Sequence, residues 1–280
     1  MSLASGTAQA LTRPAPATAT AGLRDTLHAE WTKLRTAPGT IGLLAAAVAL
    51  TVAVSAAAAA ATRCPAAGCG QDPARVSLTG IYLGQVVVAV VAVLAISGEY
   101  SSGMIRTTLA AMPRRTTVLA AKAAILTGLV LAAGAVAVLA SVLAGRLILP
   151  GRGFTPAHGF VPLSLGDGPV LRAAAGSVLY LVLIALLSLG AATAVRESAA
   201  AIGIVLGLLY LFPIIAAVVS DPHWRRHLEQ IGPMSAGLAI QATTGLRSLP
   251  LSPWAGLGVL AAWAAAALLA GGLLLRHRDA

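Results

Sequence analysis

Residues 198–220 read SAAAIGIVLGLLYLFPIIAAVVS, a stretch without Asp, Glu, Lys or Arg. A charged side chain is costly at the centre of a bilayer, and a spanning helix needs about 20 residues, so such a stretch predicts a transmembrane helix. Five other windows are long enough and free of charge, namely residues 36–62, 76–98, 123–145, 173–195 and 248–275. The sequence therefore predicts an all-α polytopic membrane protein with six transmembrane helices.

The composition agrees with a lipid environment. The chain has 280 residues, of which 58% are hydrophobic and 10% charged, too few charges for a water-soluble surface. Its net charge of +10 in a membrane protein indicates contact with anionic lipid headgroups, so we expect membrane lipid as a partner and no nucleic acid. Residues 230–246 contain Gly232 and Pro233, which favour an interfacial or re-entrant segment over a seventh span.

The distribution of basic residues predicts the orientation. Six spans place both termini on one side of the membrane, and that side would hold eleven of the nineteen Lys and Arg residues. Four of them, Arg106, Arg114, Arg115 and Lys122, follow the second window. Because cytoplasmic loops carry an excess of Lys and Arg, we expect a multi-pass protein of the plasma (cytoplasmic) membrane with both termini cytoplasmic.

The chain before the first span divides into two parts. Residues 1–22 are small and polar and predict a disordered tail. Residues 23–38 place Leu23, Leu27, Trp31 and Leu34 on one helical face and predict an amphipathic cytoplasmic interfacial helix. This helix can lie on the membrane surface, contact a cytoplasmic partner, or do both. Residues 39–280 form the six-span domain.

The two cysteines of the chain, Cys64 and Cys69, follow the first window. Two thiols with no His beside them cannot fill a tetrahedral zinc site. Pro65 and Gly68 favour a turn, and an oxidising exterior would permit a disulfide, so we favour a Cys64–Cys69 disulfide over two free thiols.

Small residues and a proline mark two of the spans. A G-x-x-x-G pattern occurs at Gly80–Gly84 and again at Gly203–Gly207, and it permits two helices to approach closely. Pro213 removes one backbone donor from the fifth span, which predicts a kink.

The sequence contains none of the common nucleotide-binding or hydrolase motifs, namely G-x-x-x-x-G-K-[ST], G-x-G-x-x-G and G-x-S-x-G. His223 and His227 are four residues apart but lack an H-E-x-x-H glutamate, which favours a hydrated helix over a metal site. The polar residues of the windows, such as Gln85, Tyr180 and Tyr210, favour interhelical hydrogen bonds over direct substrate contact. We therefore expect no catalytic residues, no metal and no cofactor in this chain.

The segment after the second window, residues 98–115, reads GEYSSGMIRTTLAAMPRR. It resembles the corresponding loop of ABC-2 type transporter permeases, particularly alanine-rich actinobacterial ones, in which a G-E-Y-x-x-G-x-x-R-x-x-L run leads to a P-R-R cluster. The stretch EWTKLR at residues 30–35 is similar to that family's helix before the first span.

The resemblance implies the membrane-spanning permease subunit of an ATP-binding cassette exporter. In such a complex, two permease subunits, here expected as a homodimer, form the translocation pathway, and a separate cytoplasmic ATPase dimer binds ATP and Mg. Residues that match the family's coupling loop are Glu99, Tyr100, Gly103, Arg106, Arg114 and Arg115. Residues that match its connecting helix are Glu30, Trp31, Lys33 and Arg35.

The pathway or the dimer contact is expected on spans two and five, where the candidates are Gly80, Gly84, Gln85, Gly203, Gly207 and Pro213. Helix faces without charge suit an amphiphilic or apolar cargo. The alternative function is a non-transporting membrane anchor or assembly subunit. An intramembrane enzyme ranks third, because the spans contain no paired carboxylates and no nucleophile beside a base.

Overall fold

The computed structural model describes residues 38–65, 70–101 and 115–277, and within these ranges it contains helices and loops but no strand. The long helices are α2 (Pro38–Ala61), α4 (Ile81–Ser101), α6 (Arg115–Ile148), α7 (Gly168–Val195), α8 (Ser198–Val218) and α11 (Pro253–His277). The short α-helices are α3 (Pro73–Ser77), α9 (Pro222–Ile231) and α10 (Pro233–Gly237). Four 3-10 turns complete the described chain, η1 (Leu149–Arg152), η2 (Pro156–His158), η3 (Leu238–Gln241) and η4 (Leu246–Ser248).

All six long helices are long and apolar enough to cross a membrane, which confirms the predicted six-span, all-α architecture. The third helix differs most from its window, because α6 begins at Arg115 and its apolar stretch extends to Arg152. Charge-free windows end at the nearest charge, whereas a helix can continue past a basic residue near its ends, so the window underestimated this helix. The predicted interfacial helix at 23–38 lies almost entirely outside the described residues, as does the N-terminal tail.

Acidic residues begin three of the helices. Asp72 and Asp221 cap α3 and α9, and each is followed by a proline in the first turn, where a missing N–H costs nothing. Glu197 caps α8 by accepting from the backbone N–H groups of Ala200 and Ala199, which lower its pKa. A depressed pKa keeps this cap ionised at neutral pH, and its contribution to stability is lost only as the pH falls through the lowered pKa.

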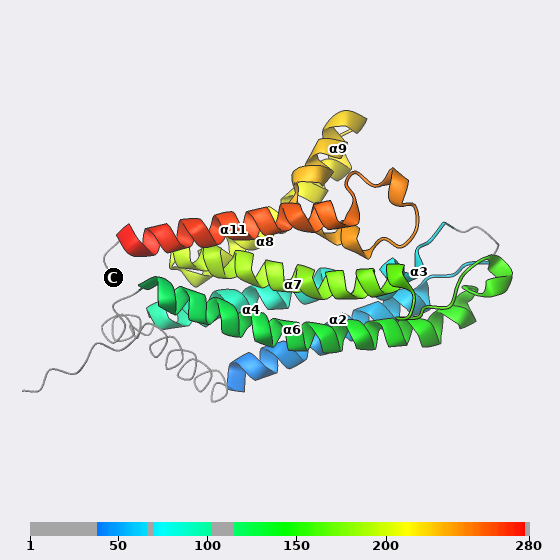
Figure 1. Cartoon of the computed structure of the whole chain (residues 1–280), viewed down its shortest axis with the longest axis horizontal. Coiled ribbons are helices and arrows are strands. Elements are labelled where there is room, and N and C mark those ends of the chain that lie inside the picture. Colours follow the sequence, from blue (N-terminus) through cyan, green and yellow to red (C-terminus); the bar gives the residue numbers. More distant parts are fainter. Residues whose placement is uncertain (1–37, 66–69, 102–114, 278–280) are drawn as a thin grey trace, which may run out of the picture.

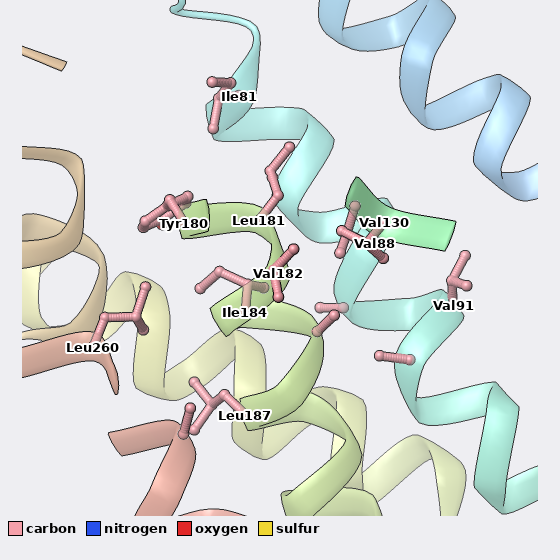
Figure 2. Close-up of a cluster of buried hydrophobic side chains, with 14 of the residues drawn as sticks. Ile81, Val88, Val91, Val130, Tyr180, Leu181, Val182, Ile184, Leu187 and Leu260 are labelled. Atoms are coloured by element: carbon pink, nitrogen blue, oxygen red, sulfur yellow. The ribbon is translucent and has the colours of Figure 1, made fainter. Parts of the chain in front are cut away.

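Helix α7 is the central element of the bundle. Of its span, 67% is buried, against 22% for α2, α8 and α11. Figure 1 shows α7 lying between α11 and α6, and it also contacts α4 and α8. In the core, Ile184 and Leu187 of α7 lie on the side of Leu260 of α11 (Figure 2). Val88 of α4 lies beside Val130 of α6 in the same core.

The antiparallel helices define two ends of the bundle. At one end, which we call the elbow end, α4 finishes at Ser101, α6 starts at Arg115, and the chain turns from α7 to α8 at 196–197. At the other end, which we call the cavity end, lie α3, η4 and the helices α9 and α10. Figure 1 shows α9 extending away from the bundle there.

Residues 230–246 do not form a seventh span. They comprise the end of α9, then α10 and η3, and the last two contact α11. Met234, Leu238 and Ile240 in this segment are almost fully buried. The segment is thus a short, packed insertion at the cavity end of the bundle.

The two G-x-x-x-G patterns occupy opposite environments. A Cβ atom added at Gly80 would lie 1.9 Å from the carbonyl oxygen of Thr51, and one at Gly84 would lie 2.2 Å from the hydroxyl of the same residue, so α4 packs tightly on α2. The backbone N–H of Gly80 also donates to the hydroxyl of Ser55 at 3.0 Å. At Gly203 and Gly207 an added Cβ would meet nothing within 4 Å.

This contrast makes a prediction about stability. Gly80→Ala forces α4 away from α2 and should lower the free energy of unfolding by about 1–3 kcal/mol, as overpacking does. Gly203→Ala, the matched control, adds the same methyl group to an open surface and should leave the thermal midpoint equal or higher. Thermal unfolding of the detergent-purified variants measures both, and equal midpoints would contradict the close contact.

Candidate functional site

A buried polar cluster joins four helices inside the bundle. Gln85 of α4 is completely buried, and its side-chain N–H groups lie 3.1 Å from the hydroxyl of Tyr210 on α8 and 3.3 Å from the sulfur of Met234 on α10. The hydroxyl of Tyr180 on α7 donates to the carbonyl oxygen of Gln85. The hydroxyl of Tyr210 donates in turn to the backbone carbonyl of Tyr82, at 2.5 Å.

The cluster provides hydrogen-bond partners for polar groups that would find none in hydrocarbon. A buried amide or hydroxyl without a partner costs free energy, and here each polar group has a partner on another helix. Glycine at 84 and the small residues of α2 leave α4 close to the bundle axis, while Gln85 points to the side of α7 and α8. The cluster therefore fixes the positions of α4, α7, α8 and α10 relative to one another.

A cavity of about 490 Å³ adjoins this cluster at the cavity end. Tyr82 and Met234 belong to both, so the cluster forms part of the inner wall of the cavity. Apolar side chains from α8 and η3, including Pro213, Ala216 and Leu238, form another part. The volume falls within the range of about 300–1,000 Å³ that small-molecule sites occupy.

Charged groups lie at the same cavity. Arg225 and Glu229 on α9 are one helical turn apart, with 3.9 Å between the Arg225 Nε and the Glu229 Oε1, and both are partly exposed. Arg75 of α3 lines this cavity and also a second one of about 420 Å³. The two cavities share Arg75, Tyr82 and Leu249, so they are neighbours.

The side chain of Asp72 holds the cavity end together. It is 8% exposed and caps α3 through the backbone N–H groups of Ala74 and Arg75. It also accepts from the backbone N–H of Thr243 at 2.5 Å, the Thr243 hydroxyl at 2.7 Å and the backbone N–H of Thr244 at 3.0 Å. One carboxylate thus fastens the loop before α11 to the loop before α4.

Two further hydrogen bonds position the insertion between α8 and α11. The indole N–H of Trp263 on α11 donates to the carbonyl of Ile231, at 3.0 Å. The guanidinium of Arg172 on α7 donates to the carbonyl of Ala242, at 2.5 Å. Both ends of the short α10–η3 segment are therefore held by long helices.

The predicted coupling residues flank or occupy a segment outside the described ranges. Glu99 and Tyr100 lie in the last turn of α4, and Arg115 begins α6, but the structure does not describe their side chains. Gly103, Arg106 and Arg114 lie outside the described residues altogether. The predicted connecting-helix residues Glu30, Trp31, Lys33 and Arg35 are outside it as well. The structure does describe Lys122 of α6, which is 6% exposed and has its ammonium 3.2 Å from the carbonyl of Ala95 on α4.

The predicted pathway or dimer residues separate into four groups. Gly80 and Gly84 face α2 of the same chain, and Gln85 lies in the polar cluster. Gly203 and Gly207 are exposed on α8. Pro213 lies inside α8, which continues to Val218, and it lines the larger cavity. Their roles in a pathway or a dimer stay predictions.

The remaining candidates are the two cysteines and the histidine pair. Cys64 is 1% exposed, and Cys69 lies outside the described residues, so their pairing stays a prediction. The rings of His223 and His227 are adjacent, with centroids 4.5 Å apart, on the exposed α9. Within the described ranges, no group of three or more His, Cys, Asp or Glu side chains could hold a metal ion.

Sequence reasoning named Gln85, Tyr180 and Tyr210 as polar residues of the spans but did not bring them together. It missed the parts played by Asp72 and Met234. A polar residue in an otherwise apolar window was the available signal for Gln85. For Asp72 the signal was the Asp-Pro pair that begins α3, but this pair indicates only the helix cap.

The polar cluster predicts a cost for losing its amide. Gln85→Leu keeps a similar side-chain volume but leaves the Tyr180 hydroxyl without its acceptor. It should lower the free energy of unfolding by about 1–3 kcal/mol. Ser188→Ala is the control, because the buried Ser188 hydroxyl bonds only to Ile184 in its own helix and should change stability less. If both variants melted at the wild-type temperature in detergent, the cluster would not contribute to stability.

The two Asp-Pro caps provide a second matched pair. Asp221→Ala removes only a helix cap, whereas Asp72→Ala also releases Thr243 and Thr244. We expect Asp72→Ala to destabilise the protein by about 1–3 kcal/mol more than Asp221→Ala does. Thermal unfolding in detergent compares the two, and an equal effect would exclude a contribution from the loop contact.

Comparison with known proteins relates most of the membrane-spanning part of the chain to a known family. A family model described as ABC-2 family transporter protein matches residues 26–219, more than half of the chain. The match covers α2 to α8 and the segment between α4 and α6, whereas α9, α10 and α11 follow it. No curated protein matches the chain, and the narrower likeness to actinobacterial permeases stays a prediction. On this match and its six membrane-length helices, the chain belongs to the ABC-2 family of transporter proteins.

Proposed function

We propose that this protein is the membrane-spanning permease subunit of an ATP-binding cassette exporter. A separate cytoplasmic ATPase dimer would bind ATP and Mg, and two copies of this chain would form the translocation pathway between them. The observation that carries the proposal is the family match over five of the six membrane-length helices. Membership of this family makes the chain a multi-pass membrane permease of an ABC transporter; the exporter direction, the partner and the dimer are the proposed part.

The proposed coupling element is the segment 102–114 with its flanks in α4 and α6. This segment contains Arg106 and Arg114, and Arg115 follows it, so it presents three guanidinium groups within ten residues. Lys122 supports the assignment because its contact with Ala95 joins the helices on either side of the segment. A force on this segment would therefore act on α4 and α6 together.

The proposed orientation places the elbow end and both termini in the cytoplasm and the cavity end outside. The basic residues of the elbow support it through the positive-inside rule. This orientation puts the coupling segment on the side where ATP is available. We also propose that the membrane concerned is the plasma membrane.

The test is ATP hydrolysis by the complex that co-purifies with this chain from its own membranes in mild detergent. In the variant Arg106→Glu, Arg114→Glu, Arg115→Glu, the reversed charges should lower hydrolysis at least roughly fivefold or uncouple it from transport, because like charges across an interface cost several kcal/mol. Salt screens both the attraction in the wild type and the repulsion in the variant, so the difference between the two should shrink as the salt concentration rises.

The matched control reverses three exposed arginines at the cavity end, Arg146, Arg226 and Arg247, and should leave hydrolysis at the wild-type level. Equal loss in both triple variants would contradict coupling at the elbow. If no ATPase co-purified under conditions that preserve other membrane complexes, the exporter proposal would fall. A non-transporting anchor would instead bind a partner without changing its ATP hydrolysis.

A further inference from the structure

The two cavities at the cavity end have a charge arrangement that the transporter assignment does not explain. Four charged side chains line them, Asp72, Arg75, Arg225 and Glu229. Asp72 already accepts hydrogen bonds from four residues, and Arg225 lies next to Glu229. Three of these four charges are therefore engaged within the protein.

Arg75 is the exception. Its side chain is exposed to both cavities, and within the described part of the chain no carboxylate or carbonyl accepts from its guanidinium. Its backbone is nevertheless fixed, because its N–H lies 3.4 Å from Asp72 and its carbonyl accepts from Leu78 and Thr79. The fixed backbone keeps the origin of this side chain at the junction of the two cavities.

Part of the wall of the larger cavity is apolar. Ala216, Met234 and Leu238 are each less than 5% exposed, and they line the larger cavity together with Pro213 and Leu249. A guanidinium binds carboxylate, sulfate and phosphate groups well, often through two parallel hydrogen bonds. An apolar wall behind such a group favours a ligand whose anionic head carries a hydrocarbon or aromatic body.

We propose that these joined cavities bind an anionic amphiphile, with its head group on Arg75 and its apolar body against α8, α10 and η3. Arg75 and α8 lie within the residues matched by the family model, whereas the part of the site from α9 to η4 follows them. The site thus goes beyond the proposed function. Identifying its ligand as cargo rests on the exporter proposal, whereas binding itself does not.

The experiment measures binding of tritiated decyl phosphate to the full-length protein in amphipol by scintillation proximity, without an ATPase. Wild-type protein should bind it saturably. Arg75→Gln should weaken binding at least about tenfold, which corresponds to about 1.4 kcal/mol. Arg226→Gln is the matched control, because Arg226 is an exposed arginine of α9 that lines neither cavity.

A second variant tests the apolar wall. Ala217→Phe adds a ring at an exposed α8 position that lines the larger cavity, and it should also weaken binding while Arg75 stays in place. The thermal midpoints of all three variants are measured in parallel. If Arg75→Gln melts at the wild-type temperature and still binds as Arg226→Gln does, the proposal is overturned.

Competition identifies the chemistry of the ligand. Decyltrimethylammonium and decyl maltoside should compete poorly, and equal competition by either would overturn the role of the charge. Inorganic phosphate competing as well as decyl phosphate would overturn the role of the apolar body. Stronger competition by dioleoyl phosphatidylglycerol would assign the site to a lipid, and stronger competition by naphthalene sulfonate to a water-soluble anion; both outcomes support an anionic amphiphile.

Discussion

The lack of water in the hydrocarbon of a bilayer is the constraint on which this structure depends. Backbone N–H and C=O groups that cross hydrocarbon need internal partners, so each crossing must be a helix. The same constraint applies to side chains, and Gln85 is the clearest case, because its amide finds partners on α7, α8 and α10. Close approach makes this arrangement possible. Without a Cβ at Gly80 and Gly84, α4 lies against Thr51 of α2 and within reach of the tyrosines on α7 and α8.

The sequence predicted the crossings well because the penalty for a buried charge is large and local. It was less informative where a residue's environment depends on another part of the chain. The patterns Gly80–Gly84 and Gly203–Gly207 are identical in spacing, yet the first is filled by α2 and the second is open. Lys122 precedes the third charge-free window but lies inside α6, because the carbonyl of Ala95 accepts from its ammonium and a basic stem can be buried near a helix end.

The candidate site was harder to predict than the fold for a related reason. Its residues come from α3, α4, α8, α9, α10 and the turns η3 and η4, and their convergence depends on helix rotations that apolar composition does not encode. Asp72 illustrates the limit. Its neighbour Pro73 indicates a helix cap, which the structure contains, but nothing in the local sequence indicates that the same carboxylate also holds Thr243, 171 residues away along the chain.

Helix α4 connects the polar cluster with the predicted coupling residues. α4 runs from the polar cluster at Tyr82 and Gln85 to the predicted coupling residues at its last turn. A displacement of α4 at the elbow end must either carry α8 and α10 with it or break the hydrogen bonds of Gln85, each worth a net of about 0.5–1.5 kcal/mol. Tyr82 and Met234 belong both to the cluster and to the wall of the larger cavity, so either response changes that wall. In the proposed exporter, the cluster would therefore make the shape of the cavity depend on the position of α4.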